Sequence, residues 1–472
     1  MSTECFDVLL AGNYLTTLVA AGVIAQAGKR VCVVNPVPSW GGHFTRLTVD
    51  GINFDPGAVS HEFTAFNAEG AKDPLSYDSR RRSDVGRFIG LIEEFTRSQL
   101  ELVRMREPQM VYGGQLLPDL IMSNQFAAVH HPVLAGRVRE EQELVARSAE
   151  SVLHPRHKKT SPLFIERSYY EASETKHGAT LHAAVFEPMF YKMSGVSTTQ
   201  LLALYHRIAW LPLYYPETVR SQFGPTPQRL QDTFFCYPRA GYIGAFGEAL
   251  VRRMQETGVT IIRDPISSLE SQPGKAAIVL KDGRRLESSH VAWSLAHDQL
   301  LTAATGGPAS PLKRWSATLV FVTIPRRQLT KSFSVLYAPD DRILFYRACN
   351  QTDSAGLEED PVRIVIEVNP DYASAQWLDD EGKVEARVRD DFASLGIVGD
   401  PQHVRVVGTK ALKNVILLPS RENWTLLEQE RDVLLDRYPG VVFTRNVEAF
   451  FTDTLNDQII KGLKLGEQFK AA

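Results

Sequence analysis

The sequence predicts an α/β protein, in which a Rossmann-like nucleotide-binding domain is combined with a discontinuous α+β domain carrying an antiparallel sheet. Three observations lead to this fold class. Residues 6–35 follow a strand–turn–helix–strand pattern, residues 236–300 add a helix and further strands, and residues 316–410 alternate apolar and polar side chains in several runs. A chain of 472 residues is long enough for two or three domains.

The composition is that of an ordinary globular protein. The formal net charge is −3, so the bulk electrostatics favours neither nucleic acid nor an anionic membrane as a partner. The four cysteines are far apart in the sequence, and we expect no metal site. The longest apolar stretch, Leu15–Ala27, is too short to span a bilayer, and we find no signal peptide. We therefore expect a cytoplasmic protein with no membrane span.

The first element group is a βαβ unit. Phe6–Ala11 is a short apolar run typical of a buried parallel strand, and Gly12 ends it. Leu15–Gln26 is rich in Ala, Leu and Val and predicts a helix that Gly28 closes. Arg30–Val34 then predicts a second buried strand. This order predicts a right-handed crossover between two parallel strands.

The dinucleotide fingerprint of such a unit has three glycines and a final acid, and this sequence keeps only the first glycine. Gly12 allows the tight turn. Tyr14 stands where a glycine lets the pyrophosphate approach the helix, and Thr17 stands where a glycine lets the helix pack closely on the strand. Asn35 replaces the acid that binds the ribose. Taken alone, this unit leaves nucleotide binding undecided.

The segments that follow resemble the flavoprotein superfamily of protoporphyrinogen oxidase, the amine oxidases and UDP-galactopyranose mutase. Asp7–Gly42 fits the N-terminal pattern of that superfamily without a gap, including the pair Gly41 and Gly42. The stretch "VDGINFDPGAVSHEF" (49–63) resembles its next hairpin. In the superfamily the segment at Gly57 and Ala58 passes the flavin ring.

Two later matches complete the resemblance. "CYPRAGYIGAFGEALVRRMQETGVTIIRDPISSLE" (236–270) resembles the second nucleotide-domain piece, with Ile266 at the position that holds the adenine through backbone groups. A hairpin follows, turning at residues 282–283. "NVEAFFTDTLNDQIIKGLKLGEQF" (446–469) resembles the C-terminal piece, with Asp453 at the acid that binds the ribityl chain. There, Thr452 replaces a glycine, and Asn456–Phe469 predicts a final helix whose N-terminus points at the flavin.

The resemblance implies noncovalently bound FAD and a glutathione-reductase-like arrangement of the nucleotide domain. The implied FAD-binding domain comprises residues 1–70, 236–300 and 436–472, and the substrate domain comprises residues 71–235 and 301–435. The residues that it implies for cofactor binding are Gly12, Tyr14, Leu15, Asn35, Gly41, Gly42, Gly57, Ala58, Ile266, Asp453, Gln458 and Ile459.

The substrate domain has a helical and a stranded part. Residues 64–235 look mostly helical, with amphipathic helices predicted at Ser83–Arg106 and Val138–Leu153. The Met and aromatic side chains of residues 186–201 fit core positions better than a cofactor site. The runs that predict an antiparallel sheet over a substrate cavity are Thr318–Ile324, Ser334–Tyr337, Arg342–Tyr346, Arg363–Val368 and His403–Val407.

Three residues are candidates for catalysis or substrate binding. His61 follows the turn that faces the flavin, and its ordinary pKa near neutrality suits proton transfer, although a hydrogen-bonded structural role is the favoured explanation. Arg347 matches an arginine that faces the substrate in the mutase-like branch, and its fork of donors suits a phosphate or carboxylate. A surface ion pair is the other explanation of Arg347. Tyr346 could flank the ligand beside it.

Three functions are compatible with these patterns. The first is an FAD-dependent oxidoreductase that takes a hydride from a small to medium organic substrate, an anion being one option. The second is a flavin-dependent sugar-nucleotide mutase with a phosphate site at Arg347. The third is a flavin-free binding protein, as Rab GDP dissociation inhibitors are on this scaffold. Tyr14, Thr17, Asn35 and Thr452 favour the third function, whereas the ordered set of three matches favours the first. The sequence does not predict the oligomeric state.

Overall fold

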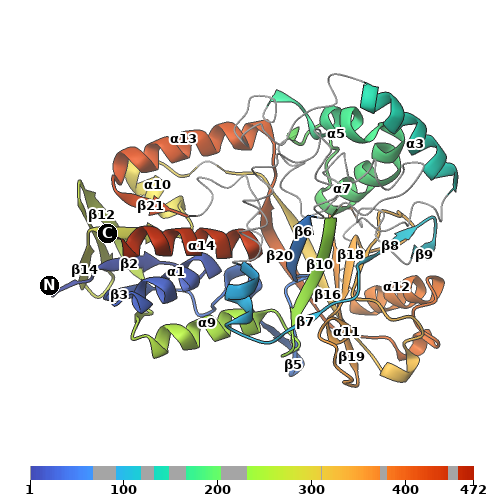
Figure 1. Ribbon diagram of the computed structural model, residues 1–472, viewed down its shortest axis with the longest axis horizontal. Helices are drawn as coiled ribbons and strands as arrows, with labels where there is room; N and C mark the ends of the chain where they lie inside the picture. Colours follow the sequence, from blue (N-terminus) through green and yellow to red (C-terminus); the bar gives the residue numbers. More distant parts are fainter. Residues whose placement is uncertain are drawn as a thin grey trace.

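A computed structural model describes residues 2–66, 92–117, 132–147, 166–203, 231–309, 311–372, 380–444 and 455–471. A parallel sheet with its helices lies at one end of the long axis, and a seven-stranded sheet lies at the other (Figure 1). Within these ranges, no helix has the length and apolar character needed to cross a bilayer.

The parallel sheet joins three distant pieces of the chain. Its strand order is β11-β3-β2-β15-β21, and all four pairings are parallel. The strands are β2 (Val8–Ala11), β3 (Val31–Val34), β11 (Thr260–Ile262), β15 (His290–Trp293) and β21 (Val441–Phe443). The three segments that the sequence analysis expected to form one domain thus contribute strands to one sheet. The exact domain boundaries stay a prediction.

Strands β2 and β3 are buried on both faces, which explains why their sequences are continuous apolar runs. Val8 and Leu10 point to the helices, and Leu9 and Ala11 point to the opposite side. There a four-stranded sheet of β1 (Thr3–Cys5), β14 (Arg285–Ser288), β13 (Lys275–Leu280) and β12 (Ile266–Gln272) covers them. α10 (Asp298–Thr305) and α13 (Arg421–Arg437) pack against each other and contribute to the same core.

Helices α1 (Leu15–Gln26) and α14 (Leu455–Lys470) lie side by side on the other face (Figure 1). Their close approach depends on two glycines of α14. A Cβ on Gly462 would lie 2.6 Å from Val19 Cβ and 2.9 Å from the carbonyl oxygen of Thr16, and a Cβ on Gly466 would lie 2.7 Å from Val23. α9 (Gly244–Glu256) also packs against α1, and it lies within residues 236–300, where the sequence predicted a helix.

The second large sheet has the strand order β20-β16-β19-β18-β17-β8-β9 and is antiparallel except between β17 and β8. Its strands are β8 (Gln109–Tyr112), β9 (Gln115–Leu117), β16 (Arg314–Ile324), β17 (Val335–Tyr337), β18 (Arg347–Asn350), β19 (Val362–Val368) and β20 (Arg405–Leu417). α12 (Glu381–Ser394) contributes to the core on one face of this sheet.

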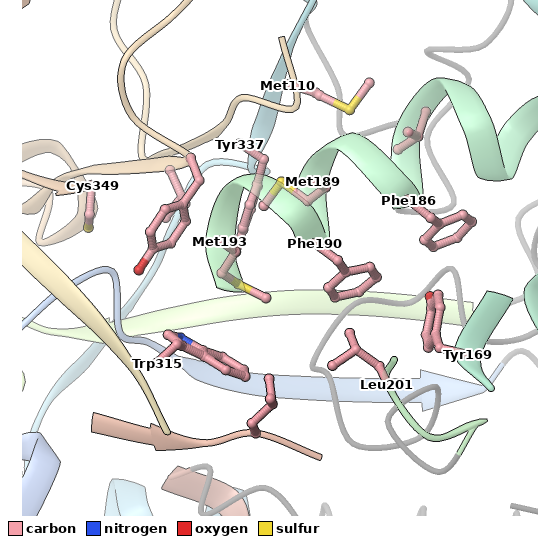
Figure 2. Close-up of a cluster of buried hydrophobic side chains, with 14 of the residues drawn as sticks. Met110, Tyr169, Phe186, Met189, Phe190, Met193, Leu201, Trp315, Tyr337 and Cys349 are labelled. Carbon is pink, nitrogen blue, oxygen red and sulfur yellow. The ribbon is translucent and has the colours of Figure 1, made fainter. Parts of the chain in front are cut away.

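An aromatic and sulfur-rich cluster covers the other face. Phe186 ends the π-helical turn His182–Phe186, and α7 (Glu187–Ser194) follows it. Met193 of α7 points toward Trp315 of the sheet, and Phe190 packs against Tyr169 in the same buried cluster as Met189 (Figure 2). The expectation that residues 186–201 belong to the core is therefore confirmed for these side chains. The helices α3 (Pro132–Arg147), α5 (Tyr169–His177) and α6 (Ala179–Leu181) complete this region.

Several predicted elements were wrong. Leu102–Arg104 forms β7 instead of continuing a helix, because it pairs with β10 (Gln231–Pro238) in a three-stranded sheet with β6 (His61–Phe66). The described part of residues 64–235 thus contains strands β7–β9 as well as helices. Residues 342–346 form turns before β18 begins at Arg347, and His403 closes a 3₁₀ turn before β20. Residues 83–91 and 148–153 lie outside the described residues.

Candidate functional site

The turn after β2 is built around Gly12. Its φ of 147° disfavours any side chain, and a Cβ would lie 1.7 Å from Ser294 Oγ. Ser294 follows β15 and donates to the carbonyl oxygen of Ala11 (3.0 Å), so the hydroxyl of Thr17 donates to Ser294 Oγ (2.7 Å). Thr17, where the fingerprint has its third glycine, therefore ties the first turn of α1 to the end of β15.

Tyr14 occupies the space between this turn and the next glycine pair. It precedes α1 in extended conformation and is 9% exposed. Its ring covers Gly42, where an added Cβ would lie 2.7 Å from two ring carbons, and it meets His43 edge-on at 5.6 Å between ring centroids. Gly41 and Gly42 both have positive φ, at 92° and 60°. The phenol ring thus lies where the second fingerprint glycine would admit a pyrophosphate.

The N-terminus of α1 is capped from within the chain. Gln458 of α14 is fully buried, and its Oε1 accepts a hydrogen bond from the backbone N–H of Leu15 at 2.9 Å. The Gln458 carbonyl oxygen accepts a hydrogen bond from Thr16 Oγ1 at 3.2 Å. The neighbouring Ile459 is buried in the apolar core around α1. Asp453 lies outside the described residues, as does Thr452.

Asn35 is also engaged by its own loop. It is fully buried, its Oδ1 accepts from Val37 N (2.9 Å), and its Nδ2 donates to the Ser39 carbonyl oxygen (3.3 Å). Arg263 holds the same loop by donating to the carbonyl oxygen of Val37 (2.8 Å) and by lying 4.4 Å over the ring of Trp40. The loop after β3 is therefore closed over Asn35.

Ile266 begins β12 and pairs with Leu280 of β13. It is partly buried at the edge of the core beside the parallel sheet. The structure places it beyond β11, as the sequence predicted, and its proposed role toward an adenine stays a prediction.

Asp55 anchors the turn that follows β5 (Ile52–Phe54), the second strand of a hairpin with β4 (Leu47–Val49). Its fully buried carboxyl group accepts hydrogen bonds from the hydroxyl of Tyr237 and from the backbone N–H of Ile243 (2.8 Å), which precedes α9. Burial raises the pKa of Asp55 to about 7, although these donors and Arg363 act in the opposite direction. The turn is thereby fixed to β10 and α9.

The next residues of this turn meet the seven-stranded sheet. Gly57 has φ 127°, and a Cβ there would lie 2.8 Å from Glu367 Oε1. The same oxygen accepts a hydrogen bond from the backbone N–H of Ala58 at 2.5 Å. Glu367 also accepts from Arg347 Nε (2.8 Å) and Nη2 (2.7 Å) and from the hydroxyl of Tyr346 (2.7 Å). We call Tyr346, Arg347 and Glu367 the sheet cluster.

Tyr346 and Arg347, which the sequence predicted as site residues, are linked to the predicted turn at Gly57–Ala58 by Glu367. The sequence analysis missed Glu367. Arg347 and Glu367 are direct partners in the β18–β19 register, with side chains 16% and 5% exposed. Burial opposes the positive charge of Arg347, but the Glu367 carboxylate outweighs it, so that the pKa of Arg347 lies above its ordinary value. A glutamate within the apolar run "VRIVIEV" (362–368) was the available signal for Glu367.

His61 lies in β6 in an apolar environment. Its ring stacks on Phe63 and meets Phe246 edge-on, and among the described residues its ring nitrogens have no hydrogen-bond partner. Burial, assisted by the nearby charge of Arg97, lowers the pKa of His61 to about 3. Burial thus favours the neutral imidazole and the structural role of His61, and its part in proton transfer stays a prediction.

Neither a protein-family model nor a curated protein matches this sequence, but solved structures match its fold. A reduced UDP-galactopyranose mutase superposes with a TM-score of 0.68 at 13% identity, covering 98% of this chain and 95% of the mutase. A putative protoporphyrinogen oxidase from Exiguobacterium sp. 255-15 gives 0.61 at 15% identity over 100% and 99% of the two chains. A double mutant of putrescine oxidase, redesigned in cofactor binding, gives 0.62 at 15% identity over 100% of both chains.

The chain has the fold of these solved structures of a UDP-galactopyranose mutase, a putative protoporphyrinogen oxidase and putrescine oxidase. This result confirms the resemblance that the sequence motifs predicted. Identities of 13–15% carry the fold alone, so any function has to be argued from the residues of this chain.

FAD is the cofactor that the resemblance implies, and the backbone around α1 fits it. The turn at Gly12, the start of a helix and the loop at Gly41–Gly42 are the parts that a dinucleotide cradle requires. We use the word cradle for these three parts together with the turn at Gly57–Ala58. Tyr14 and Gln458 lie in the phosphate part of the cradle, so FAD fits there only when both side chains move aside.

Among the described residues, no group of three or more His, Cys, Asp or Glu could hold a metal ion. Cys32, Cys236 and Cys349 are buried free thiols, and Cys5 is exposed.

Proposed function

We propose that the chain is an FAD-dependent oxidoreductase that accepts a hydride from a small to medium organic substrate. The observation that carries this proposal is the contact between the turn at Gly57–Ala58 and the sheet cluster through Glu367. It joins the cradle directly to a polar group on the second sheet, which is the arrangement expected of a cofactor domain that meets a substrate domain.

In this proposal the residues of the chain bind and orient, and FAD, when bound, supplies the hydride acceptor. The first-turn N–H groups of α1 would bind its pyrophosphate once Gln458 releases Leu15, and the turn at Gly57–Ala58 would lie beside its ring. The sequence predicts an FAD-binding domain of residues 1–70, 236–300 and 436–472 and a substrate domain of residues 71–235 and 301–435. α13 packs on α10 and places Leu434 in the core beside the parallel sheet, so we extend the FAD-binding domain to begin its last piece at Arg421.

The state of Arg347 separates this function from that of a sugar-nucleotide mutase. A phosphate site at Arg347 needs the donor fork of its guanidinium, and two of those donors are bound to Glu367. Turning them toward a phosphate would leave the buried carboxylate of Glu367 without its counter-charge. The geometry therefore supports a substrate that Arg347 does not hold by a phosphate or carboxylate.

The flavin-free binding protein is a second candidate because of one specific observation. Tyr14 and Gln458 fill the phosphate part of the cradle with the chain's own side chains. A protein that had stopped using a dinucleotide would gain packing and a helix cap from such residues.

The visible absorption spectrum of the purified protein tests the proposal. A flavoprotein shows bands at about 375 and about 450 nm, either as purified or after FAD is added and free FAD is removed. Anaerobic addition of primary amines, alcohols and other hydride donors should then bleach the band near 450 nm for the true substrate class. A protein that is colourless as purified and binds no added FAD at equilibrium would reject the oxidoreductase in favour of the second candidate.

A further inference from the structure

The phosphate part of the cradle contains two buried side chains from segments that are distant in sequence, Tyr14 and Gln458. Tyr14 replaces a glycine of the fingerprint, and Gln458 lies outside the fingerprint. We propose that Tyr14 and Gln458 form an internal plug that a dinucleotide must displace, so that FAD binds weakly and exchanges. This inference rests on the proposed function, because it concerns how the same cradle takes up its cofactor.

The ring of Tyr14 forms one half of the plug. It lies against Gly42, whose missing side chain makes the contact possible, because a Cβ there would overlap the ring at 2.7 Å. The edge contact with His43 and the low exposure of Tyr14 show that the ring is packed and not turned into solvent. The ring therefore occupies the approach to the first turn of α1.

The amide of Gln458 forms the other half. Its Oε1 accepts from Leu15 N–H, which is one of the first-turn donors that helix N-termini offer to phosphates. The hydrogen bond from Thr16 Oγ1 to the Gln458 backbone holds α14 at the same position. A neutral amide oxygen thus stands where a dinucleotide would present a charged one.

Both halves are side chains, so their displacement takes place by rotation about side-chain bonds. A phosphate oxygen carries negative charge, and it interacts with the positive end of the α1 dipole more favourably than an amide oxygen does. Tyr14 can leave by rotation between staggered χ1 positions. A plug of this kind lowers affinity and does not abolish it.

The test measures equilibrium binding of FAD, ADP and riboflavin to the full chain by calorimetric titration, with Tyr14→Gly and Gln458→Ala as variants. Tyr14→Phe is the matched control, because it keeps the ring. Riboflavin is the matched probe, because it lacks phosphate.

Tyr14→Gly removes the ring and should raise the affinity for FAD and ADP by about tenfold or more. Gln458→Ala frees Leu15 N–H and should raise both affinities by about fivefold, the equivalent of one hydrogen bond. Tyr14→Phe should bind all three probes as the wild type does, and riboflavin affinity should be the same throughout. If the wild type binds FAD and neither opening variant binds FAD or ADP more than about twofold tighter, the plug is rejected.

The plug and the proposed function fail in different ways. Tighter ADP binding in the opening variants, with no FAD binding to any protein, supports the plug and rejects the flavin function. Binding of neither FAD nor ADP to any variant that still melts cooperatively rejects both. If Tyr14→Gly does not fold, Gln458→Ala decides the question, because it opens the same helix end by truncating a single amide.

Discussion

Replacement of Glu367 by glutamine tests the junction between the cradle and the sheet cluster. The substitution preserves the shape of the side chain and removes its charge. Glu367 receives hydrogen bonds from Ala58, Tyr346 and two nitrogens of Arg347, and its side chain is only 5% exposed. The variant leaves the guanidinium of Arg347, 16% exposed, without its counter-charge.

Breaking a buried ion pair by removing one partner costs about 3–5 kcal/mol. The exposed fraction of Arg347 lets water compensate part of its charge, and the glutamine still accepts one hydrogen bond. We therefore expect Glu367→Gln to lower the free energy of unfolding by about 3 kcal/mol, the lower end of that range. Urea unfolding at neutral pH, followed by circular dichroism, measures this difference.

An exposed ion pair supplies the control. Lys313 and Glu422 lie 2.6 Å apart with side chains 60% and 59% exposed, so Glu422→Gln should cost no more than about 1 kcal/mol. The double variant Glu367→Gln/Arg347→Met should recover part of the loss, since it removes the uncompensated charge. Equal losses for the two glutamine variants, or additive losses in the double variant, would refute the assignment of a buried, coupled pair.

Three further changes test other parts of the structure. The pKa of Asp55 is raised from an unfolded value near 3.8 to about 7, so its contribution to stability is complete below about pH 4 and is lost as the pH rises through about 7. In the wild type the free energy of unfolding in urea should therefore fall by about 4 kcal/mol over that pH range, and in Asp55→Asn this fall should be absent. The pKa of His61 is lowered from 6.5 to about 3, so its contribution to stability is present above about pH 6.5 and is lost as the pH falls through about 3. His61→Phe should therefore reduce the fall in the free energy of unfolding between about pH 6.5 and about pH 3. An unchanged fall would contradict the burial argument. In thermal melts, Gly462→Ala should destabilise by about 1–3 kcal/mol, because its Cβ meets the backbone of α1. Gly22→Ala should stabilise by about 0.5–1 kcal/mol, because outside its own helix no atom of the described residues lies within 4 Å of the added Cβ. The same sign for both would show that crowding between α1 and α14 is not the cause.

The local elements could be predicted because their causes are local. Strands β2 and β3 are buried on both faces, and such strands appear in a sequence as short continuous apolar runs. The helix that the sequence predicted within residues 236–300 is α9, which begins at Gly244. The predicted helix across Leu102 was wrong because pairing with β10 decided the conformation there, and that partner lies far along the chain.

The partners within the candidate site could not be predicted for the same reason. Leu15 and Gln458 are separated by 443 positions, and Ala58 and Glu367 by 309. The sequence identifies Arg347 as a donor fork and gives no indication whether a ligand or another side chain receives it. Because Glu367 is the neighbour of Arg347 in the strand register, only the strand pairing reveals that the fork is already engaged.

The retained glycines show that a glycine pattern typical of cofactor binding can also be required by contacts with side chains of the same protein. Around the cradle, the space left by Gly12 is taken by Ser294, that left by Gly42 by Tyr14, and that left by Gly57 by Glu367. Each of these glycines would therefore be required by the packing of this chain even in the absence of a cofactor. The pattern in the sequence reports where something approaches the backbone closely, and the side chains determine what that is. For this reason the decision between a flavoenzyme and a flavin-free relative depends on whether Tyr14 and Gln458 yield to a phosphate, and not on the number of glycines that match.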